Sequence, residues 1–388
     1  MINVAGRARN RAACLLAAAA LLVALVVMTG QARAEASPAA PQGATASIVH
    51  GKSTSIKRWP WQVAVAVGKK ARPGFTPRER TFCGGSLIAP DLVITAGHCM
   101  ADVSPRNVKR TDVITGRTHL NYTRAGEEVG VKRLYMPEYS NGKRKFRSGA
   151  GAADWDVSLL LLDHPVAGTP IQIAGEDEQT SWQTGSQVKT TGWGITNPNE
   201  NEVTNGLRLA SLVMQPERIC RGWDGVAFKA ARMVCFGAPS IHASACNGDS
   251  GGPLMSTVTT PLGKQYRLVG LTSWGDFYCR GAVPSVDTRI ADNPLRGWVK
   301  RTAMEVSGVD VVGHGGASAA PVDWCRVPDI QGYTLKRAKA KLESKNCRLG
   351  QTTPDNLPGA RSGTVTYTEY FPHWLAKPGA RVKVGVVP

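Results

Sequence analysis

Short apolar stretches recur between Ile48 and about Ser307, and Gly, Pro or Asp bounds each of them. These stretches cover residues 62–67, 86–88, 92–94, 157–162, 188–191 and 267–272. Apolar stretches of this length suit strands and are too short for helices. The pattern therefore predicts an all-β domain, either a barrel or a sandwich.

A helical pattern appears toward the end of this region. Residues 293–304 place apolar Leu295, Trp298 and Val299 among basic residues. Pro294 stands at the start, where the first turn of a helix tolerates proline. We therefore expect a short helix that closes the domain.

The composition changes after this helix. Residues 313–321 read Gly-His-Gly-Gly-Ala-Ser-Ala-Ala-Pro, which is typical of a flexible linker. We place the linker at 308–320 and a second domain at 321–388. The split agrees with a length of 388 residues, since domains commonly hold about 100 to 200 residues.

The second domain has an α+β pattern. Thr334 can cap a helix that begins at Leu335, and residues 364–368 and 381–387 alternate like strands. Because 68 residues is small for a self-sufficient core, a bridge between Cys325 and Cys347 would help to stabilise it.

The composition describes a folded, basic protein. Hydrophobic residues make up 42% of the chain and charged residues 20%, which excludes a fully disordered protein. The formal net charge of +18 permits attraction to nucleic acid, to anionic wall polymers or to anionic membranes. No basic run is interleaved with aromatic residues and no zinc-finger spacing occurs, so DNA binding is disfavoured.

The first 47 residues resemble processed segments. Arg7, Arg9 and Arg11 precede an apolar run at 12–28, and a small-residue site follows at 32–34. This arrangement predicts an export signal over residues 1–34, with an uncleaved N-terminal anchor as the alternative. Removal of the signal deletes four arginines and leaves a charge of +14.

The segment that follows, 35–47, is small, Pro-rich and almost uncharged, so we interpret it as a propeptide. We expect an extracellular protein.

Cysteine usage agrees with export. Cys14 lies in the signal, and an even number of cysteines remains, which implies disulfides in an exported chain. The remaining eight are Cys83, Cys99, Cys220, Cys235, Cys246, Cys279, Cys325 and Cys347. No Cys-x-x-Cys occurs, so a zinc ribbon or a thioredoxin-like site is disfavoured.

Four motifs identify a family. Gly248-Asp249-Ser250-Gly251-Gly252-Pro253 is the strongest, and residues 95–99, 156–160 and 192–194 read Thr-Ala-Gly-His-Cys, Asp-Val-Ser-Leu-Leu and Gly-Trp-Gly. In this order they resemble the chymotrypsin/trypsin family of serine proteases. The likeness covers Ile48 to about Ser307. It implies two six-stranded β-barrels followed by a short helix.

The resemblance assigns His98, Asp156 and Ser250 to a catalytic triad. A serine hydroxyl needs an adjacent imidazole to take its proton, and the imidazole needs a buried carboxylate to hold its tautomer. The backbone N–H groups of Gly248 and Ser250 would form the oxyanion hole. Asp154 is the competing acid, but Asp156 directly precedes the apolar strand, as the family motif requires.

The resemblance also locates the substrate site. Ser244, six residues before the nucleophile, would form the floor of the pocket for the P1 side chain, and Ser285 would stand on its wall. Because neither is acidic, we expect uncharged P1 residues of medium to large size. Ser273-Trp274-Gly275 resembles the strand that pairs with the substrate backbone. The family further implies bridges Cys83–Cys99, Cys220–Cys235 and Cys246–Cys279.

Activation is implied by the residues that begin the matching region. Ile48-Val49-His50-Gly51 resembles a mature N-terminus, whose Ile48 amine would pair with Asp249 after cleavage. Ser47 replaces the usual basic residue, which argues against activation by a trypsin-like enzyme. Residues 143–147 are basic and could form an exosite, although a solvated loop is the simpler interpretation.

The C-terminal residues resemble a PASTA domain, a wall-associated module of bacterial exported proteins. The likeness rests on Val327-Pro328-Asp329-Ile330, on Gly332 and on Lys377-Pro378-Gly379. It implies binding to peptidoglycan fragments, and a surplus of +6 over residues 321–388 suits anionic wall polymers. A purely structural spacer is the alternative.

The sequence thus predicts a secreted, monomeric bacterial serine endopeptidase that is made as a precursor and acts on proteins or peptides. Its chemistry requires no metal and no cofactor. The competing class is a non-enzymatic wall-binding protein that retains a protease fold. The natural substrate, the activating protease and any bound calcium are not determined by the sequence.

Overall fold

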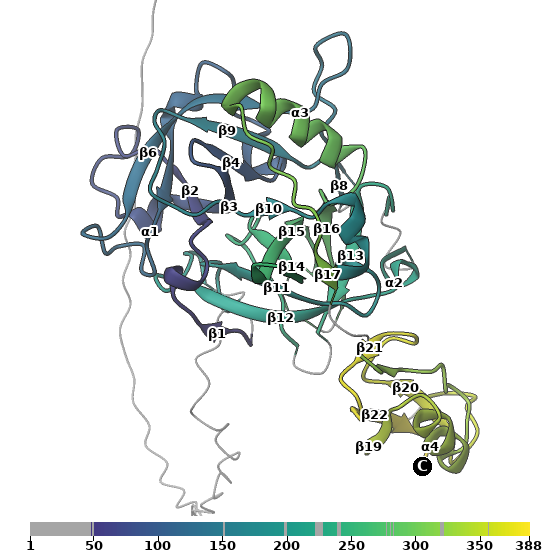
Figure 1. The fold of residues 1–388 in the computed structure, drawn as a ribbon. Helices are drawn as coiled ribbons and strands as arrows, with labels where there is room; N and C mark the ends of the chain where they lie inside the picture. Colours follow the sequence, from purple (N-terminus) through teal and green to yellow (C-terminus); the bar gives the residue numbers. More distant parts are fainter. Residues whose placement is uncertain are drawn as a thin grey trace, which may run out of the picture. The chain divides into compact units, whose positions relative to one another are not determined.

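Two closed antiparallel barrels dominate the computed structural model (Figure 1). It describes residues 48, 50–149, 152–197, 200–221, 228–238, 242–276, 278–279, 281, 283–318, 322–355 and 357–388. The predicted signal and propeptide lie outside these residues. The expected all-β architecture is confirmed.

The first barrel has the order β2-β3-β4-β9-β6-β5. Its strands are β2 (Gln62–Val67), β3 (Thr81–Ala89), β4 (Leu92–Thr95), β5 (Thr111–Thr115), β6 (Glu127–Tyr135) and β9 (Ser158–Leu162). Val63, Val65 and Leu160 are among the side chains that fill its core. β-branched and leucine side chains suit these strands because they pack well on a pleated surface.

The second barrel runs β15-β16-β13-β12-β11-β14, and pairing between β14 and β15 closes it. Its strands are β11 (Gln187–Gly192), β12 (Arg208–Met214), β13 (Met233–Gly237), β14 (Pro253–Thr260), β15 (Gly263–Trp274) and β16 (Ser285–Arg289). The barrels meet through aromatic residues: the Trp59 and Tyr266 rings lie 4.9 Å apart, and Trp61 Nε1 donates to Met255 Sδ.

Short elements surround the barrels. The additional strands are β1 (Lys52–Ser53), which pairs with β12, β10 (Gln172–Ile173), which pairs with β15, and the pair β7 (Arg147–Gly149) and β8 (Ala152–Asp154). The short helices are α1 (Pro77–Arg80), α2 (Glu217–Arg221), η1 (Ile56–Arg58), η2 (His98–Met100), η3 (Val108–Arg110) and η4 (Glu176–Trp182).

The expected closing helix is α3 (Leu295–Ser307), with Pro294 at its N-cap. Leu295, Val299 and Ala303 belong to a core cluster that holds side chains of both barrels. Their spacing of four residues keeps them on one face of the helix. Gly308 ends the helix in a left-handed conformation with a φ of 67°, which glycine adopts without strain.

The C-terminal domain packs one helix against a small sheet. Its elements are β18 (Cys325–Arg326), α4 (Leu335–Glu343), β19 (Arg348–Pro354), β20 (Val365–Thr368), β21 (Leu375–Ala376) and β22 (Arg381–Val386), with sheet orders β19-β22-β20 and β18-β21. Thr334 caps α4 by accepting a hydrogen bond from the Arg337 N–H. Ala338 and Leu342 are fully buried beside the Cys325–Cys347 disulfide.

The segment between the domains differs from the flexible linker that its composition predicts. Gly313 N donates to Ile173 O, and Gly316 N donates to Glu178 Oε1. Residues Ala317–Ser318 form strand β17, which pairs with β14. A Cβ on Gly313 would lie 2.1 Å from Arg267 Nε, so this glycine is required by a close approach of the backbone. Composition could not distinguish that requirement from flexibility.

The C-terminal domain also contacts the second barrel directly. Gln215 is buried, donates from Nε2 to Leu375 O at 2.9 Å and accepts from Leu375 N at 2.8 Å. Trp374 is fully buried, and a Cβ on Gly237 would lie 2.9 Å from its ring. Residues 45–388 accordingly group as one compact unit. No helix among the described residues is long and apolar enough to cross a membrane.

Candidate active site

Strand ends position the three residues expected to form the triad. His98 begins η2, three residues after β4 ends at Thr95, and Asp156 lies just before β9. Ser250 precedes β14 of the second barrel. Because β4 and β9 are paired neighbours, their ends bring His98 and Asp156 together.

Asp156 is buried and surrounded by donors. Its Oδ2 lies 2.8 Å from His98 Nδ1, its Oδ1 accepts from the His98 backbone N–H at 2.6 Å, and Ser273 Oγ donates to Oδ2 at 2.5 Å. The Asp156 side chain is 0% exposed, whereas the His98 side chain is 30% exposed. The carboxylate therefore fixes the ring on one side and leaves its other nitrogen directed away from the pair.

The pKa of His98 is raised. Burial alone would lower the pKa of the ring, but the hydrogen bond to Asp156 and the charge of that carboxylate outweigh burial. An imidazole held in this way is a better proton acceptor than one without a carboxylate partner.

Ser250 lies beside the His98–Cys99 turn. Its carbonyl oxygen accepts from Gly84 N at 2.8 Å and lies 3.7 Å from Cys99 Sγ. The next residue, Gly251, donates to Thr272 O, and a Cβ there would lie 2.1 Å from Thr95 Oγ1. Both barrels therefore clamp the segment around the serine. In the described structure the Ser250 hydroxyl makes no hydrogen bond to His98, and such bonds often tighten only when substrate binds.

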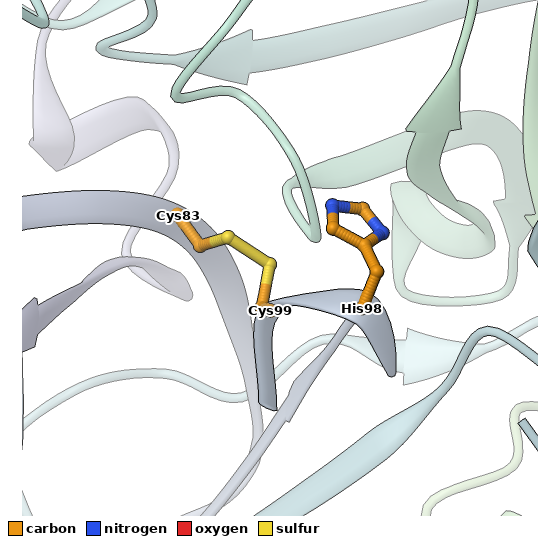
Figure 2. A group of neighbouring side chains, drawn as sticks. All are labelled: Cys83, His98 and Cys99. Carbon is orange, nitrogen blue, oxygen red and sulfur yellow. A yellow bond between two sulfur atoms is a disulfide. The ribbon is translucent and has the colours of Figure 1, made fainter. Parts of the chain in front are cut away.

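A disulfide supports the histidine. Cys83 and Cys99 are bonded, and Figure 2 shows the bridge beside the His98 ring. These three side chains are the one group of potential metal ligands that lies close together within the described ranges. Both sulfurs are used in the bridge and the ring binds Asp156, so the donor set does not fit a metal ion.

Asp249 forms a second buried acidic position. Its Oδ1 accepts from Gly194 N at 2.8 Å and its Oδ2 accepts from Cys246 N at 3.0 Å. A Cβ on Gly192 would lie 2.1 Å from Oδ1, and one on Gly194 would lie 2.4 Å from Oδ2, so the Gly-Trp-Gly motif makes room for the carboxyl. Burial raises the pKa of Asp249 to about 6, although the two N–H groups oppose the rise.

The residues expected to activate the enzyme lie in the second barrel. The Ile48 side chain is fully buried in the same core cluster as Phe236 and Ala243. His50 Nδ1 lies 3.0 Å from His242 O.

The residues expected to line the P1 pocket converge. Ser244 Oγ lies 3.5 Å from Ser285 Oγ and donates to Ala245 O at 2.8 Å. A Cβ on Gly275 would lie 3.3 Å from the Ser285 hydroxyl, so the strand that follows Trp274 approaches the same point. The two residues expected to form the floor and the wall of this pocket therefore place their hydroxyl groups side by side.

Contacts show what two residues that the sequence left open do in the fold. Asp154 forms ion pairs with Lys229 and Arg232 at 2.6 and 2.5 Å, and therefore does not compete for His98. Arg144 of the basic loop donates to the carbonyl groups of Ala101 and Val103. Its guanidinium thus anchors the loop to the segment after η2.

Sequence reasoning missed two supporting residues. Thr288 Oγ1 donates to the Asp156 carbonyl oxygen at 2.8 Å. Gly97 has no room for a side chain, because a Cβ would lie 2.9 Å from Val157 N. No local pattern marks Thr288, which comes from β16, far from Asp156 in the sequence. Gly97 belongs to the Thr-Ala-Gly-His-Cys motif. The motif indicated that this glycine is important, but not that a side chain there would collide with Val157.

Comparison with known proteins agrees with this geometry. The family model described as "Trypsin" matches residues 48–299. The chain is 30% identical over 244 residues to "Trypsin" of Saccharopolyspora erythraea, which covers 63% of this chain and 93% of that protein. It is also 30% identical over 264 residues to human "Transmembrane protease serine 5", which covers 66% of this chain and 52% of that protein. The chain therefore belongs to the trypsin family of serine endopeptidases.

Proposed function

We propose that this chain cleaves peptide bonds through Ser250, His98 and Asp156. The observation that carries the proposal is the buried Asp156 carboxylate, which holds the His98 ring at 2.8 Å while Ser250 is clamped beside the same turn. Trypsin-family enzymes act on proteins or peptides and are commonly secreted, which agrees with the predicted export signal.

Each residue has a defined role in the reaction. Ser250 Oγ attacks the scissile carbonyl carbon while His98 Nε2 takes the hydroxyl proton. His98 then gives that proton to the leaving amine as the carbon–nitrogen bond breaks, which leaves an acyl-enzyme. Water attacks the ester with the same base and restores Ser250. Asp156 stabilises the imidazolium that forms in both steps.

The segment 248–250 supplies the oxyanion site. Gly248 has a φ of 93°, a conformation that favours glycine, and this turns the chain just before the nucleophile. Neither the Gly248 N–H nor the Ser250 N–H donates to an acceptor among the described residues, so both are available to a developing oxyanion. Loss of one such donor typically costs about 2.7–4 kcal/mol of transition-state stabilisation.

A covalent label tests the triad. The secreted protein would be exposed to a fluorophosphonate and its intact mass compared with that of Ser250→Ala. We expect one adduct on a species that begins at Ile48 and none on the variant. A species that begins at Ile48 and takes no adduct would favour the non-enzymatic binding protein instead.

We propose that cleavage before Ile48 activates the enzyme. The buried Asp249 carboxyl has two backbone N–H partners and lies in the second barrel, whose core also holds Ile48. A new α-amine at Ile48 would supply the missing positive charge. Because Ser47 is not basic, the activating enzyme would not be trypsin-like, and autocleavage is the alternative.

We propose that the P1 pocket prefers uncharged side chains of medium to large size. The support is the Ser244 and Ser285 hydroxyl pair, 3.5 Å apart, at the position where a counter-charge would stand. Cleavage profiling with a peptide library tests this preference near neutral pH. Dominant cutting after Lys or Arg at that pH would contradict it.

We propose that the PASTA-like residues 321–388 bind anionic wall polymers. The support is their surplus of +6 and the exposed lysines on α4. Full-length Ser250→Ala should co-sediment with purified cell wall, and Lys336→Glu with Lys339→Glu should weaken the binding. Lys57→Glu, an exposed lysine on η1, is the matched control. Equal sedimentation of all three proteins would favour a structural spacer.

A further inference from the structure

A third buried acid, Asp287, has no part in the chemistry described so far. It lies on β16 and is 1% exposed, and neither carboxylate oxygen makes a hydrogen bond of regular geometry in the described structure. Leaving a buried polar group without a partner usually costs about 1–3 kcal/mol. A carboxyl kept in this position at such a cost calls for a functional explanation.

Asp287 lies next to the proposed P1 pocket. It shares a strand face with Ser285, because side chains two residues apart on a strand point the same way. The separation along the strand is about 7 Å. Ser285 in turn contacts Ser244. The proposed pocket would therefore present the hydroxyl pair of Ser244 and Ser285 first, with the more deeply buried Asp287 carboxyl behind it.

The strands on both sides add no charge. Asp287 pairs with Val234 on β13 and with Thr272 on β15, and the Thr272 hydroxyl is also buried without a partner. A Cβ on Gly270 would lie 3.1 Å from the Asp287 Cβ and 3.4 Å from Leu254, which places an apolar residue of β14 nearby. None of these side chains titrates.

The charged groups nearby do not neutralise the acid. Burial raises the pKa of Asp287 well above its ordinary range; the Ser273 backbone N–H opposes the rise, and the charge of Asp156 adds to it. Arg289, on the same strand, is directed to Glu217 and to the Met233 carbonyl oxygen. No lysine or arginine among the described residues forms an ion pair with Asp287.

We propose that Asp287 closes the inner end of the P1 pocket and decides whether an uncharged or a cationic P1 side chain binds. The inference rests on the proposed assignment of Ser244 and Ser285 to that pocket. With its proton, the carboxyl offers one donor and one acceptor, which suits an uncharged side chain. When a guanidinium enters, the carboxyl releases its proton to solvent and the resulting carboxylate pairs with the cation. Binding of a cationic P1 side chain therefore releases one proton.

Two matched peptides test the proposal. They differ only in P1 arginine or citrulline, since citrulline has nearly the same shape as arginine and no charge. The ratio of kcat/KM for arginine to that for citrulline should rise about tenfold per pH unit through the range in which Asp287 ionises. Titration of His98 and Asp249 affects both peptides equally and cancels in the ratio.

Variants identify the residue responsible. Asp287→Asn is close in size to the protonated acid and should make the ratio independent of pH. Asp154→Asn, a matched acid that lies in an ion pair with Lys229 and Arg232, should leave the slope unchanged. A wild-type ratio that does not vary with pH, or a slope that survives in Asp287→Asn, would overturn the proposal.

A binding measurement separates this inference from the proposed catalysis. Benzamidine, a small aryl amidinium, would be titrated calorimetrically into Ser250→Ala cleaved before Ile48, in two buffers with different ionisation enthalpies. We expect release of one proton per molecule bound, and none with Asp287→Asn present as well. Binding without proton release would overturn the inference. Proton release by a protein whose unmutated form cleaves neither peptide would contradict only the proposed function.

Discussion

Two buried acids, Asp156 of the proposed triad and Asp287 on β16, have opposite surroundings. Asp156 accepts hydrogen bonds from the His98 ring, from the His98 backbone and from Ser273. Asp287, which is close enough for the two charges to interact, has no regular hydrogen bond and a pKa raised well above the ordinary range. Equal burial therefore does not give equal surroundings. Hydrogen-bond donors favour the ionised form of a carboxyl, and burial with few donors disfavours it.

Asp249 lies between these extremes. Two backbone N–H groups contact its carboxyl, and its pKa is raised to about 6. These three acids thus form a series from several regular hydrogen bonds at Asp156, through two at Asp249, to none at Asp287. In our proposal Asp156 orients the base His98, Asp249 pairs with the new α-amine of Ile48, and Asp287 selects the P1 side chain of the substrate.

The largest expected effect comes from removing the charge of the fully partnered acid. Asp156→Asn should lower kcat about 10⁴-fold with little change in KM, because the amide holds the wrong tautomer of His98. Steady-state kinetics on a peptide substrate measure the change. Asp154→Asn, two residues away, should keep kcat within about twofold, and an equal loss in both variants would contradict the assignment.

The same variant changes the pH profile. Asp156 raises the pKa of His98 against the effect of burial, so Asp156→Asn should move the acid limb of kcat/KM to lower pH. The stability that this pair contributes through His98 is present at pH values below the unfolded pKa of the ring and is lost as pH rises through the folded pKa.

The next effect concerns Asp249 in the uncleaved chain. Its folded pKa of about 6 exceeds the unfolded value of 3.8, so the folded state binds a proton more tightly. Stability relative to Asp249→Asn should therefore fall by about 2 kcal/mol as pH rises from 4 to 7. Urea unfolding of Ser250→Ala, with and without Asp249→Asn, measures this difference.

Cleavage before Ile48 should remove most of this pH-dependent loss of stability, because in our proposal the new α-amine of Ile48 pairs with Asp249. The cleaved enzyme carrying Asp249→Asn should have lost most of its activity. Full activity in that variant would refute the activation switch, and a cleaved chain with an unchanged pH dependence of stability would also contradict it.

A smaller effect is expected from crowding the same carboxyl. Gly194→Ala would bring a Cβ within 2.4 Å of the Asp249 carboxylate, and we expect a loss of about 1–3 kcal/mol together with reduced activity. Gly149→Ala is the control, because no atom lies within 4 Å of the added Cβ. Thermal unfolding of both variants would show whether Asp249 needs the space.

The smallest effect is expected at the ion pairs of Asp154. Lys229 and Arg232 outweigh burial and lower the pKa of Asp154. The ion pairs stabilise the fold by about 1 kcal/mol, a small value because Lys229 is half exposed. This stabilisation is present above the unfolded pKa of Asp154 and is lost as the pH falls through its folded pKa. The stability difference between Asp154→Asn and the wild type should therefore shrink as the pH falls below the unfolded pKa of 3.8.

Much of the fold follows from local pattern. Residues 62–67 and 188–191 indicated strands because their apolar side chains suit a pleated surface, and Pro294 marked the start of α3. The composition of the glycine-rich segment 313–316 predicted a flexible linker, whereas hydrogen bonds from Gly313 and Gly316 attach it to the second barrel and its neighbouring elements. Gly313 and Gly316 make room for Arg267 and Glu178, and nothing in the composition of the segment reveals those neighbours.

The sequence by itself determined the family and the order of the proposed triad residues through short motifs, and it determined an all-β domain through strand periodicity. The two barrels followed from the resemblance to the family. The tertiary structure decided what surrounds each buried acid. Thr288 and Ser273 form regular hydrogen bonds with Asp156 from strands more than a hundred residues away, while among the described residues no regular hydrogen bond reaches the Asp287 carboxyl. The charge of a carboxyl depends on the dielectric of its surroundings and on the hydrogen-bond donors near it in space. The spacing of residues along the chain encodes neither.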